Sequence, residues 1–295
     1  MTKRWWVAAA AACVISSTDP AAAQQHDRVE WHSSWRPFQW WNYATTAVLL
    51  GGAIGIGVGT GFQEDGHRGG VLFDEPLQDA FRLRTRSGRD VARSIGDRLY
   101  QGSLIYPHLV DALLVAGIAH ERWEVAAQIF LINVQSQSLS ALVSLATEHF
   151  VGRARPSTEP CEADPKYERF CDGSDEYGSF ISGHTSMAMT SAGLICAHHS
   201  KIPLYGGGVP DVAACVTGIV LASSTGVMRM INDRHWPTDV ITGAAVGTIS
   251  GYVVPMLLHY GFGDGPLTPS SAEVRLLVLP TAGRDRLGLA WLGAF

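Results

Sequence analysis

The sequence predicts an all-α protein, a bundle of long apolar helices followed by a short C-terminal β-hairpin. Apolar stretches of helical length fill the second half of the chain, and Gly- and Pro-containing turns separate them. No period of about twenty to fifty residues recurs, which excludes a solenoid. Hydrophobic residues make up 46% of the chain, enough to build a sizeable core. The expected bundle helices are 107–119, 123–150, 184–199, 211–228 and 237–259.

The composition limits the partners of the chain. A formal net charge of −5 over 295 residues offers no basic surface for a polyanion, so we expect no nucleic-acid partner. We divide the chain into a signal peptide, a region of N-terminal apolar and surface helices, a helical core and a hairpin tail. Their bounds are 1–23, 24–106, 107–262 and 263–295.

Residues 1–23 have the pattern of a cleaved signal peptide. Lys3 and Arg4 precede an apolar stretch, and Ala21-Ala22-Ala23 form a small-residue cleavage site. The apolar stretch is too short to span a membrane, and an uncleaved anchor is the alternative. The pattern therefore predicts an exported protein of the cell envelope, on its periplasmic side.

The region before the core contains two expected helices. The apolar stretch 45–62 has Gly51, Gly55 and Gly59 at four-residue spacing, which favours close packing of one helix on another. This stretch is not a phosphate loop, because it lacks the Lys-Ser/Thr ending. A surface helix is expected over 76–99, with a solvated outer face that holds its arginines (Arg82, Arg84, Arg86, Arg89 and Arg93).

The five cysteines fit an exported protein. Cys161 and Cys171 bracket a short polar loop, and outside the cytoplasm we expect them to form a disulfide. A metal pair is the alternative, but no second pair stands at zinc spacing, so we expect no metal. Cys196 and Cys215 lie in apolar stretches and are expected to be buried thiols.

The tail has the alternation of strands rather than the period of a helix. Residues 274–280 form a short run rich in Leu and Val, and residues 286–292 place Leu or Trp at alternate positions, on either side of Thr-Ala-Gly-Arg-Asp. This pattern predicts a β-hairpin.

Three segments of the core combine arginine or histidine with a helix end. Arg155-Pro156 follows the helix 123–150, and an arginine presents a planar fork that matches phosphate oxygens. Ser182-Gly183-His184 stands at a helix start, where unpaired N–H groups attract an anion. The third segment, 229–239, holds Arg229, His235 and Asp239. Together they predict one anion-binding catalytic site.

The third segment predicts its own local geometry. Pro237 fits the first position of a helix, which places Asp239 in the first turn near the positive end of the helix dipole. A turn before this helix would let Asp239 accept one ring N–H of His235. The other ring nitrogen would then be bare, as a nucleophile requires.

The three segments resemble the signature motifs of the type 2 phosphatidic acid phosphatase superfamily, which also contains bacterial acid phosphatases and vanadium haloperoxidases. The first motif is Lys, six residues and Arg-Pro, and the second is Pro-Ser-Gly-His. The third is Ser-Arg, five residues, His, three residues and Asp. Arg155-Pro156, Ser182-Gly183-His184, and Arg229 with His235 and Asp239 match them. The resemblance covers residues 107–259 and implies a helical bundle of this superfamily's type.

Three positions depart from the motifs. Ile181 replaces a Pro and Met228 replaces a Ser, which are minor changes. Glu148 stands where the family has its Lys, and a carboxylate at contact distance from phosphate is repelled by about 4 kcal/mol at a surface-like dielectric. Either Glu148 pairs with an arginine such as Arg153 while another cation takes the vacant place, or the site is weakened.

The resemblance implies a metal-independent phosphatase that hydrolyses phosphate monoesters, lipid phosphates among them, through a phosphohistidine on His235. Asp239 would hold the ring, and His184 would protonate the leaving alcohol and then activate water. The phosphate oxygens would be bound by Arg155, Ser182, the Gly183 N–H and Arg229. We expect no cofactor, except vanadate if the protein is a haloperoxidase. The other alternative, which Glu148 favours, is a non-catalytic envelope protein that binds phosphate or lipid.

Membrane association is expected, while the number of spans is open. Membrane members of the family have six spans and a cytoplasmic N-terminus, whereas a cleaved signal puts the mature N-terminus outside. Either 107–119 does not span, or the signal stays, or the protein is not transmembrane. The acidic loop 157–179 is expected to line the mouth of the site and to set specificity.

Overall fold

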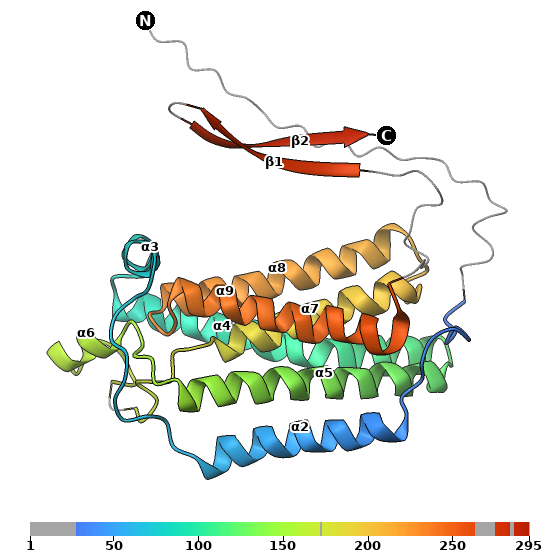
Figure 1. Ribbon diagram of the computed structural model, residues 1–295, viewed down its shortest axis with the longest axis horizontal. Helices are drawn as coiled ribbons and strands as arrows, with labels where there is room; N and C mark the ends of the chain where they lie inside the picture. The colour runs from blue at the N-terminus through green and yellow to red at the C-terminus, as the bar shows by residue number, and fades with distance from the viewer. Residues whose placement is uncertain (1–27, 172, 263–274, 284–285, 295) are drawn as a thin grey trace, which may run out of the picture.

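The computed structural model describes residues 28–171, 173–262, 275–283 and 286–294. The predicted signal peptide 1–23 lies outside them. The described core is a bundle of long helices that run side by side (Figure 1), which confirms the all-α prediction. The long elements are α2 (Trp40–Gly59), α4 (Arg86–Tyr106) with η1 (Pro107–Ala119), α5 (Trp123–Phe150), α7 (Gly183–Lys201), α8 (Val209–Ile231), and α9 (Pro237–Thr248) with η2 (Ile249–Val253) and η3 (Met256–Tyr260).

Two short helices and the loops around them gather at one end of the bundle, on the left in Figure 1. They are α3 (Asp74–Phe81) and α6 (Thr158–Ala163). At the C-terminus, the backbone of β1 (Arg275–Gly283) pairs with that of β2 (Arg286–Ala294) as an antiparallel ribbon. No residue of the candidate site described below comes from this ribbon.

Helix α7 is the central helix of the bundle and packs on α8, α9, α5 and α4. Small and hydroxyl-bearing residues line it, so neighbouring backbones approach closely. Glycines of α9 and η2 at four-residue spacing make this close approach. A Cβ on Gly243 would lie 2.7 Å from the carbonyl oxygen of the residue that caps α7, and a Cβ on Gly247 or Gly251 would lie 2.2 or 2.0 Å from a carbonyl oxygen within α7. This contact sets the start of α9 against the start of α7.

The glycine stripe predicted in α2 has no such partner. A Cβ on Gly51, Gly55 or Gly59 would meet nothing within 4 Å. The helix packs on α5 through Gly52 and Gly57 instead, where Leu142 and Leu145 lie opposite. The expectation of close packing at Gly51, Gly55 and Gly59 is therefore wrong, because these positions face away from the bundle.

The predicted surface helix 76–99 is two helices, α3 and α4. The chain breaks between them, and the side chain of Thr85 caps α4 by accepting the N–H of Gly88 at 3.2 Å. Arg89 is buried rather than solvated, and it donates to the carbonyl oxygens of Leu83 and Tyr167 at 2.8 and 2.5 Å. The loop that follows α6 covers this face of α4, which composition alone does not show.

The segment 107–119 is not a helix of its own. It continues α4 as η1, and together they form one stretch, Arg86–Ala119. Five helices of the described chain are long and apolar enough to cross a membrane: Trp40–Gly59, Arg86–Ala119, Trp123–Phe150, Val209–Ile231 and Pro237–Tyr260. The central α7 is not among them. The five apolar helices support membrane association.

Both pairs of cysteines in the described chain form disulfides. Cys161 and Cys171 are bonded, which confirms the predicted bridge. Cys196 of α7 and Cys215 of α8 are also bonded, at an S–S distance of 2.02 Å, so the expectation of two buried thiols is wrong. Their Cα atoms lie 4.4 Å apart because α7 and α8 pack side by side, a proximity that the sequence does not reveal.

Candidate active site

The predicted site residues come from four helix ends at the same end of the bundle. The segment after α5 supplies Arg155, and α7 begins with Gly183 and His184. Arg229 lies in the last turn of α8, and His235 lies in the short connection to α9. The structure brings these ends together, and we describe their contacts in turn.

The ring of His235 is buried between a backbone carbonyl and a guanidinium. Its Nδ1 donates to the carbonyl oxygen of Ser179 at 2.7 Å, which fixes the proton on that nitrogen. Its Nε2 lies 3.3 Å from Nη1 of Arg155 and accepts from it. The first and third motif segments therefore meet at one ring nitrogen, the one that carries no proton.

The sequence predicted a direct hydrogen bond from the His235 ring to Asp239. In the structure Asp239 does not accept it, and the carbonyl oxygen of Ser179 does. One oxygen of Asp239 accepts the backbone N–H of Trp236 at 3.0 Å and the hydroxyl of Ser179 at 2.6 Å, and the other binds Arg153. As the third residue of α9, Asp239 folds back to cap its own helix, which turns the carboxylate away from the ring. Ser179 links the two, because its carbonyl binds His235 and its hydroxyl binds Asp239.

Arg153 is part of a buried ion network behind the ring. Its Nη2 donates to Asp74 at 2.5 Å, its Nη1 binds Asp239, and all three side chains are nearly or wholly buried. Asp74, the first residue of α3, also accepts the N–H of Thr238 at 2.8 Å. Arg153 is engaged by Asp74 and Asp239 rather than by Glu148, so the alternative that paired it with Glu148 is wrong.

His184 and Arg229 share a carboxylate that sequence reasoning missed. Asp97 of α4 binds Nη2 of Arg229, and the same oxygen lies 3.5 Å from Nε2 of His184. Tyr100, one turn later, lies against the imidazole with ring centroids 4.3 Å apart. No local pattern marks Asp97, because it lies 132 residues from Arg229 in the chain.

The positive charges of Arg155 and Arg229 act on both His184 and His235. Burial lowers the pKa of His235 well below its usual value, and Arg155 and Arg229 lower it further. Burial lowers the pKa of His184 to about 4, against a hydrogen bond to Asp97 that raises it, and the same two arginines contribute to the decrease. Both rings are therefore neutral at pH 7 in the free site.

Comparison with known proteins agrees with this arrangement. Residues 130–261 match the family model described as the PAP2 superfamily. This match covers somewhat less than half of the chain. A curated relative, the lipid A 1-phosphatase of Porphyromonas gingivalis, is 40% identical over 74 residues, which are 25% of this chain and 15% of the relative. The chain thus covers only a small part of that relative's length. No solved structure shows a significant match.

The groups of Ser182 and Gly183 that were expected to bind phosphate are hydrogen-bonded to other residues of the chain. The hydroxyl of Ser182 is buried and lies 2.8 Å from that of Thr185. The N–H of Gly183 donates to Oε1 of Glu148 at 3.0 Å. Glu148 therefore turns toward the motif, and its carboxylate sits on an amide that was expected to bind phosphate.

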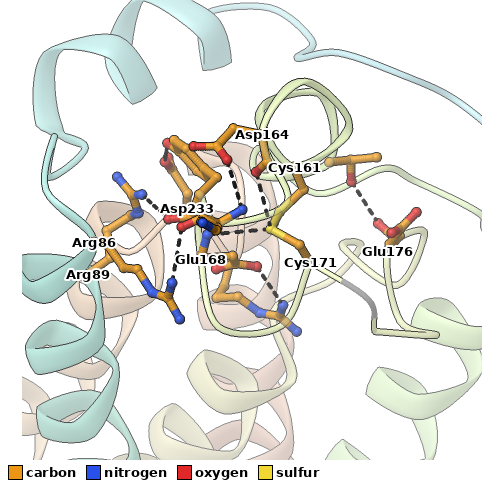
Figure 2. The surroundings of a disulfide bond; sticks show 12 residues. Arg86, Arg89, Cys161, Asp164, Glu168, Cys171, Glu176 and Asp233 are labelled. Atoms are coloured by element: carbon orange, nitrogen blue, oxygen red, sulfur yellow. Dashed lines mark hydrogen bonds and ion pairs between the residues drawn. A yellow bond between two sulfur atoms is a disulfide. The ribbon is translucent and has the colours of Figure 1, made fainter.

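The loop between the first two motif segments supplies further charges to the candidate site. Asp175 binds Arg155 at 3.0 Å and also binds Arg234, the residue before His235. Glu168 lies between Arg234 and Arg93, at 3.4 and 3.3 Å. The bridge between Cys161 and Cys171 closes this loop over α4 (Figure 2), and the N–H of Glu168 donates to Sγ of Cys171 at 3.4 Å.

A large groove opens beside this loop. It has a volume of about 870 Å³ and lies between the end of α2, the end of α5 and residues 173–177. Gly57 and Leu145 form part of its apolar wall, while Gln63 and His149 add polar groups. Its wall includes Glu176, the neighbour of Asp175, so the groove adjoins the candidate site.

Proposed function

We propose that the protein hydrolyses lipid phosphate monoesters with His235 as the nucleophile. The observation that carries this proposal is the contact between Nη1 of Arg155 and Nε2 of His235 at 3.3 Å. A guanidinium at this place can bind a phosphate oxygen and so bring the phosphorus within reach of the ring nitrogen. Arg229 and His184, which both contact Asp97 in the free protein, would complete the anion site.

The first step would transfer the phosphoryl group to the enzyme. Arg155 turns from the ring to a phosphate oxygen, which frees the lone pair of Nε2. That lone pair forms a bond to phosphorus while the bond from phosphorus to the alcohol oxygen breaks. Nδ1 keeps its hydrogen bond to the carbonyl of Ser179, so the positive charge that develops on the ring is stabilised.

His184 would handle the protons. It donates one to the departing alcohol oxygen, and afterwards it takes one from the water that attacks phosphorus and breaks the bond to His235. The negative charge of a bound substrate raises the pKa of His184 above the value of about 4 in the free site, which lets it act as an acid. The proposed reaction uses only side chains and water, without a metal ion.

Three observations support a lipid substrate. Five helices are long and apolar enough to cross a membrane, and the relative in Porphyromonas gingivalis is named as a lipid A 1-phosphatase. The groove of about 870 Å³ beside the site has room for more than a phosphate group. We propose that the site faces the periplasm, as the predicted signal peptide indicates.

Phosphate release from a lipid phosphate in detergent tests this function. We expect His235→Ala to abolish turnover and Asp239→Asn to reduce it, since Asp239 holds Ser179, which in turn holds the ring. Asp79→Asn, on the exposed side of α3, is the matched control and should leave turnover unchanged. Undiminished hydrolysis by His235→Ala would refute the assignment.

One observation favours a second candidate, a phosphate- or lipid-binding protein without turnover. It is the contact of Glu148 with the Gly183 N–H, which removes one predicted phosphate donor. Comparing Glu148→Lys with the parent separates the two. If only the variant releases phosphate, the parent is a binding protein, and if the parent releases phosphate, it is an enzyme.

A further inference from the structure

The replacement of the motif Lys by Glu148 raises the question of which cation compensates. Relative to the family motifs, the site lacks one positive charge and gains one negative charge. Arg234 immediately precedes His235, and its side chain is only 12% exposed. No motif includes this position, and the sequence analysis above gave it no role.

Arg234 and Arg155 hold the same carboxylate oxygen. Oδ2 of Asp175 lies 3.0 Å from Nη2 of Arg155 and also contacts Nη2 of Arg234. The other end of Arg155 touches Nε2 of His235. An anionic oxygen thus already sits between two guanidiniums, one of which reaches the nucleophile.

We propose that Arg234 is the third phosphate-binding cation of this site and replaces the motif Lys. A phosphate oxygen takes the place between Arg155 and Arg234 that Oδ2 of Asp175 holds in the free protein. A guanidinium binds carboxylate and phosphate oxygens with the same N–H donors. Replacing the Asp175 oxygen by a phosphate oxygen therefore keeps both guanidiniums paired. This inference rests on the proposed function.

The charges around Arg234 are consistent with this role. Burial is the main cause of the low pKa of His235, and the positive charges of Arg155, Arg229 and Arg234 lower this pKa further. The charge of Arg234 therefore acts on the ring. On its other side Arg234 is held by Glu168, at 3.4 Å from Nη1. Nη2 is the end directed toward Arg155, through the oxygen that they share.

Arg93 provides a matched control. It also pairs with Glu168, at 3.3 Å, and its side chain is 17% exposed, close to the value for Arg234. It differs in the one respect that matters, because no hydrogen bond or ion pair joins it to Asp175 or Arg155 in the described part of the chain. Loss of charge at Arg93 should therefore affect the loop but not phosphate binding.

The experiment measures two quantities on the full-length protein in detergent. One is the affinity for inorganic phosphate by calorimetry, and the other is kcat/KM for a lipid phosphate. Arg234→Gln should lower both, kcat/KM by about 100-fold, as for the loss of one donor to a transition-state oxyanion. Arg93→Gln should change neither by more than about threefold. Arg234→Lys, which keeps the charge, should retain most of the affinity.

A rescue separates phosphate binding from a structural effect. Glu148→Lys restores the family's cation, so added to Arg234→Gln it should recover most of the lost affinity and kcat/KM. Thermal unfolding reports whether each variant is folded. The proposal is overturned if Arg234→Gln behaves like Arg93→Gln, or if Glu148→Lys recovers nothing in a folded double variant.

The failure of this inference can be told from failure of the proposed function. If the parent releases no phosphate but binds inorganic phosphate, and Arg234→Gln abolishes binding, turnover fails and the role of Arg234 stands. If the parent turns over and Arg234→Gln does so equally well, the function stands and the role of Arg234 fails.

Discussion

At the scale of residues, three carboxylates occupy the groups that the proposed phosphate would bind. Asp175 pairs with Arg155, Asp97 bridges Arg229 and His184, and Glu148 accepts the N–H of Gly183. In the free site, the groups proposed to bind phosphate are thus already paired with carboxylates of the chain, and a substrate has to displace these carboxylates. Buried cations remain paired in both states, which avoids the cost of an unpaired charge.

The acid in the proposed reaction predicts the dependence on pH. His184, with a pKa of about 4, has to be protonated, while His235, whose pKa lies well below 6.5, stays neutral. Lowering the pH toward about 4 therefore increases the active form, and kcat/KM should fall by up to about tenfold per unit as the pH rises above that value. The measurement is a profile of kcat/KM from acidic to neutral pH.

The variant Asp97→Asn should shift the pH profile of kcat/KM in a predictable direction. The hydrogen bond to Asp97 raises the pKa of His184, so its loss should move the profile to lower pH. A profile that is flat over acidic and neutral pH, or one that Asp97→Asn moves to higher pH, would contradict the role of His184.

The sequence predicted the motif residues but not the residues that support them. Arg155, His184, Arg229 and His235 have family spacing, and the structure gathers them at one end of the bundle. Ser179 binds through its backbone carbonyl, an interaction that no residue pattern encodes. The partners that come from distant helices, Asp74 and Asp97, are equally invisible because tertiary packing alone brings them to the site.

At the scale of elements, the same glycine spacing has opposite meanings in two helices. Gly51, Gly55 and Gly59 meet no neighbour, while the glycines of α9 and η2 approach backbone carbonyls of α7. Glycines at four-residue spacing show that one face of a helix lacks side chains, but they do not show whether another helix packs against that face. This is why the sequence predicted the bundle and most helix ranges, yet expected close glycine packing in a helix whose glycines have no neighbour.

Alanine substitutions test this difference. In Gly247→Ala the new Cβ would lie 2.2 Å from the carbonyl oxygen of Ser186, so we expect a loss of about 1–3 kcal/mol in the free energy of unfolding and a displaced start of α9. Gly55→Ala meets nothing within 4 Å and should be neutral or stabilising by up to about 1 kcal/mol. Unfolding in detergent measures both, and equal effects of the two would contradict the described packing.

At the scale of the whole molecule, the helices present much apolar surface outward. Val48, Ile54 and Val58 of α2 are 72%, 56% and 85% exposed, and this helix packs on α5. A hydrocarbon surrounding would cover such a face. We therefore expect the protein to stay in the pellet when membranes are washed with alkaline carbonate, and recovery in the wash would contradict insertion.

The two disulfides have a practical consequence for following the maturation of the chain. All four cysteines of the described residues are paired, and the fifth, Cys13, belongs to the predicted signal peptide. A maleimide dye applied to the denatured, unreduced protein would therefore mark the precursor at Cys13 and pass over the processed form. Loss of the dye signal would then report whether the predicted signal peptide is removed.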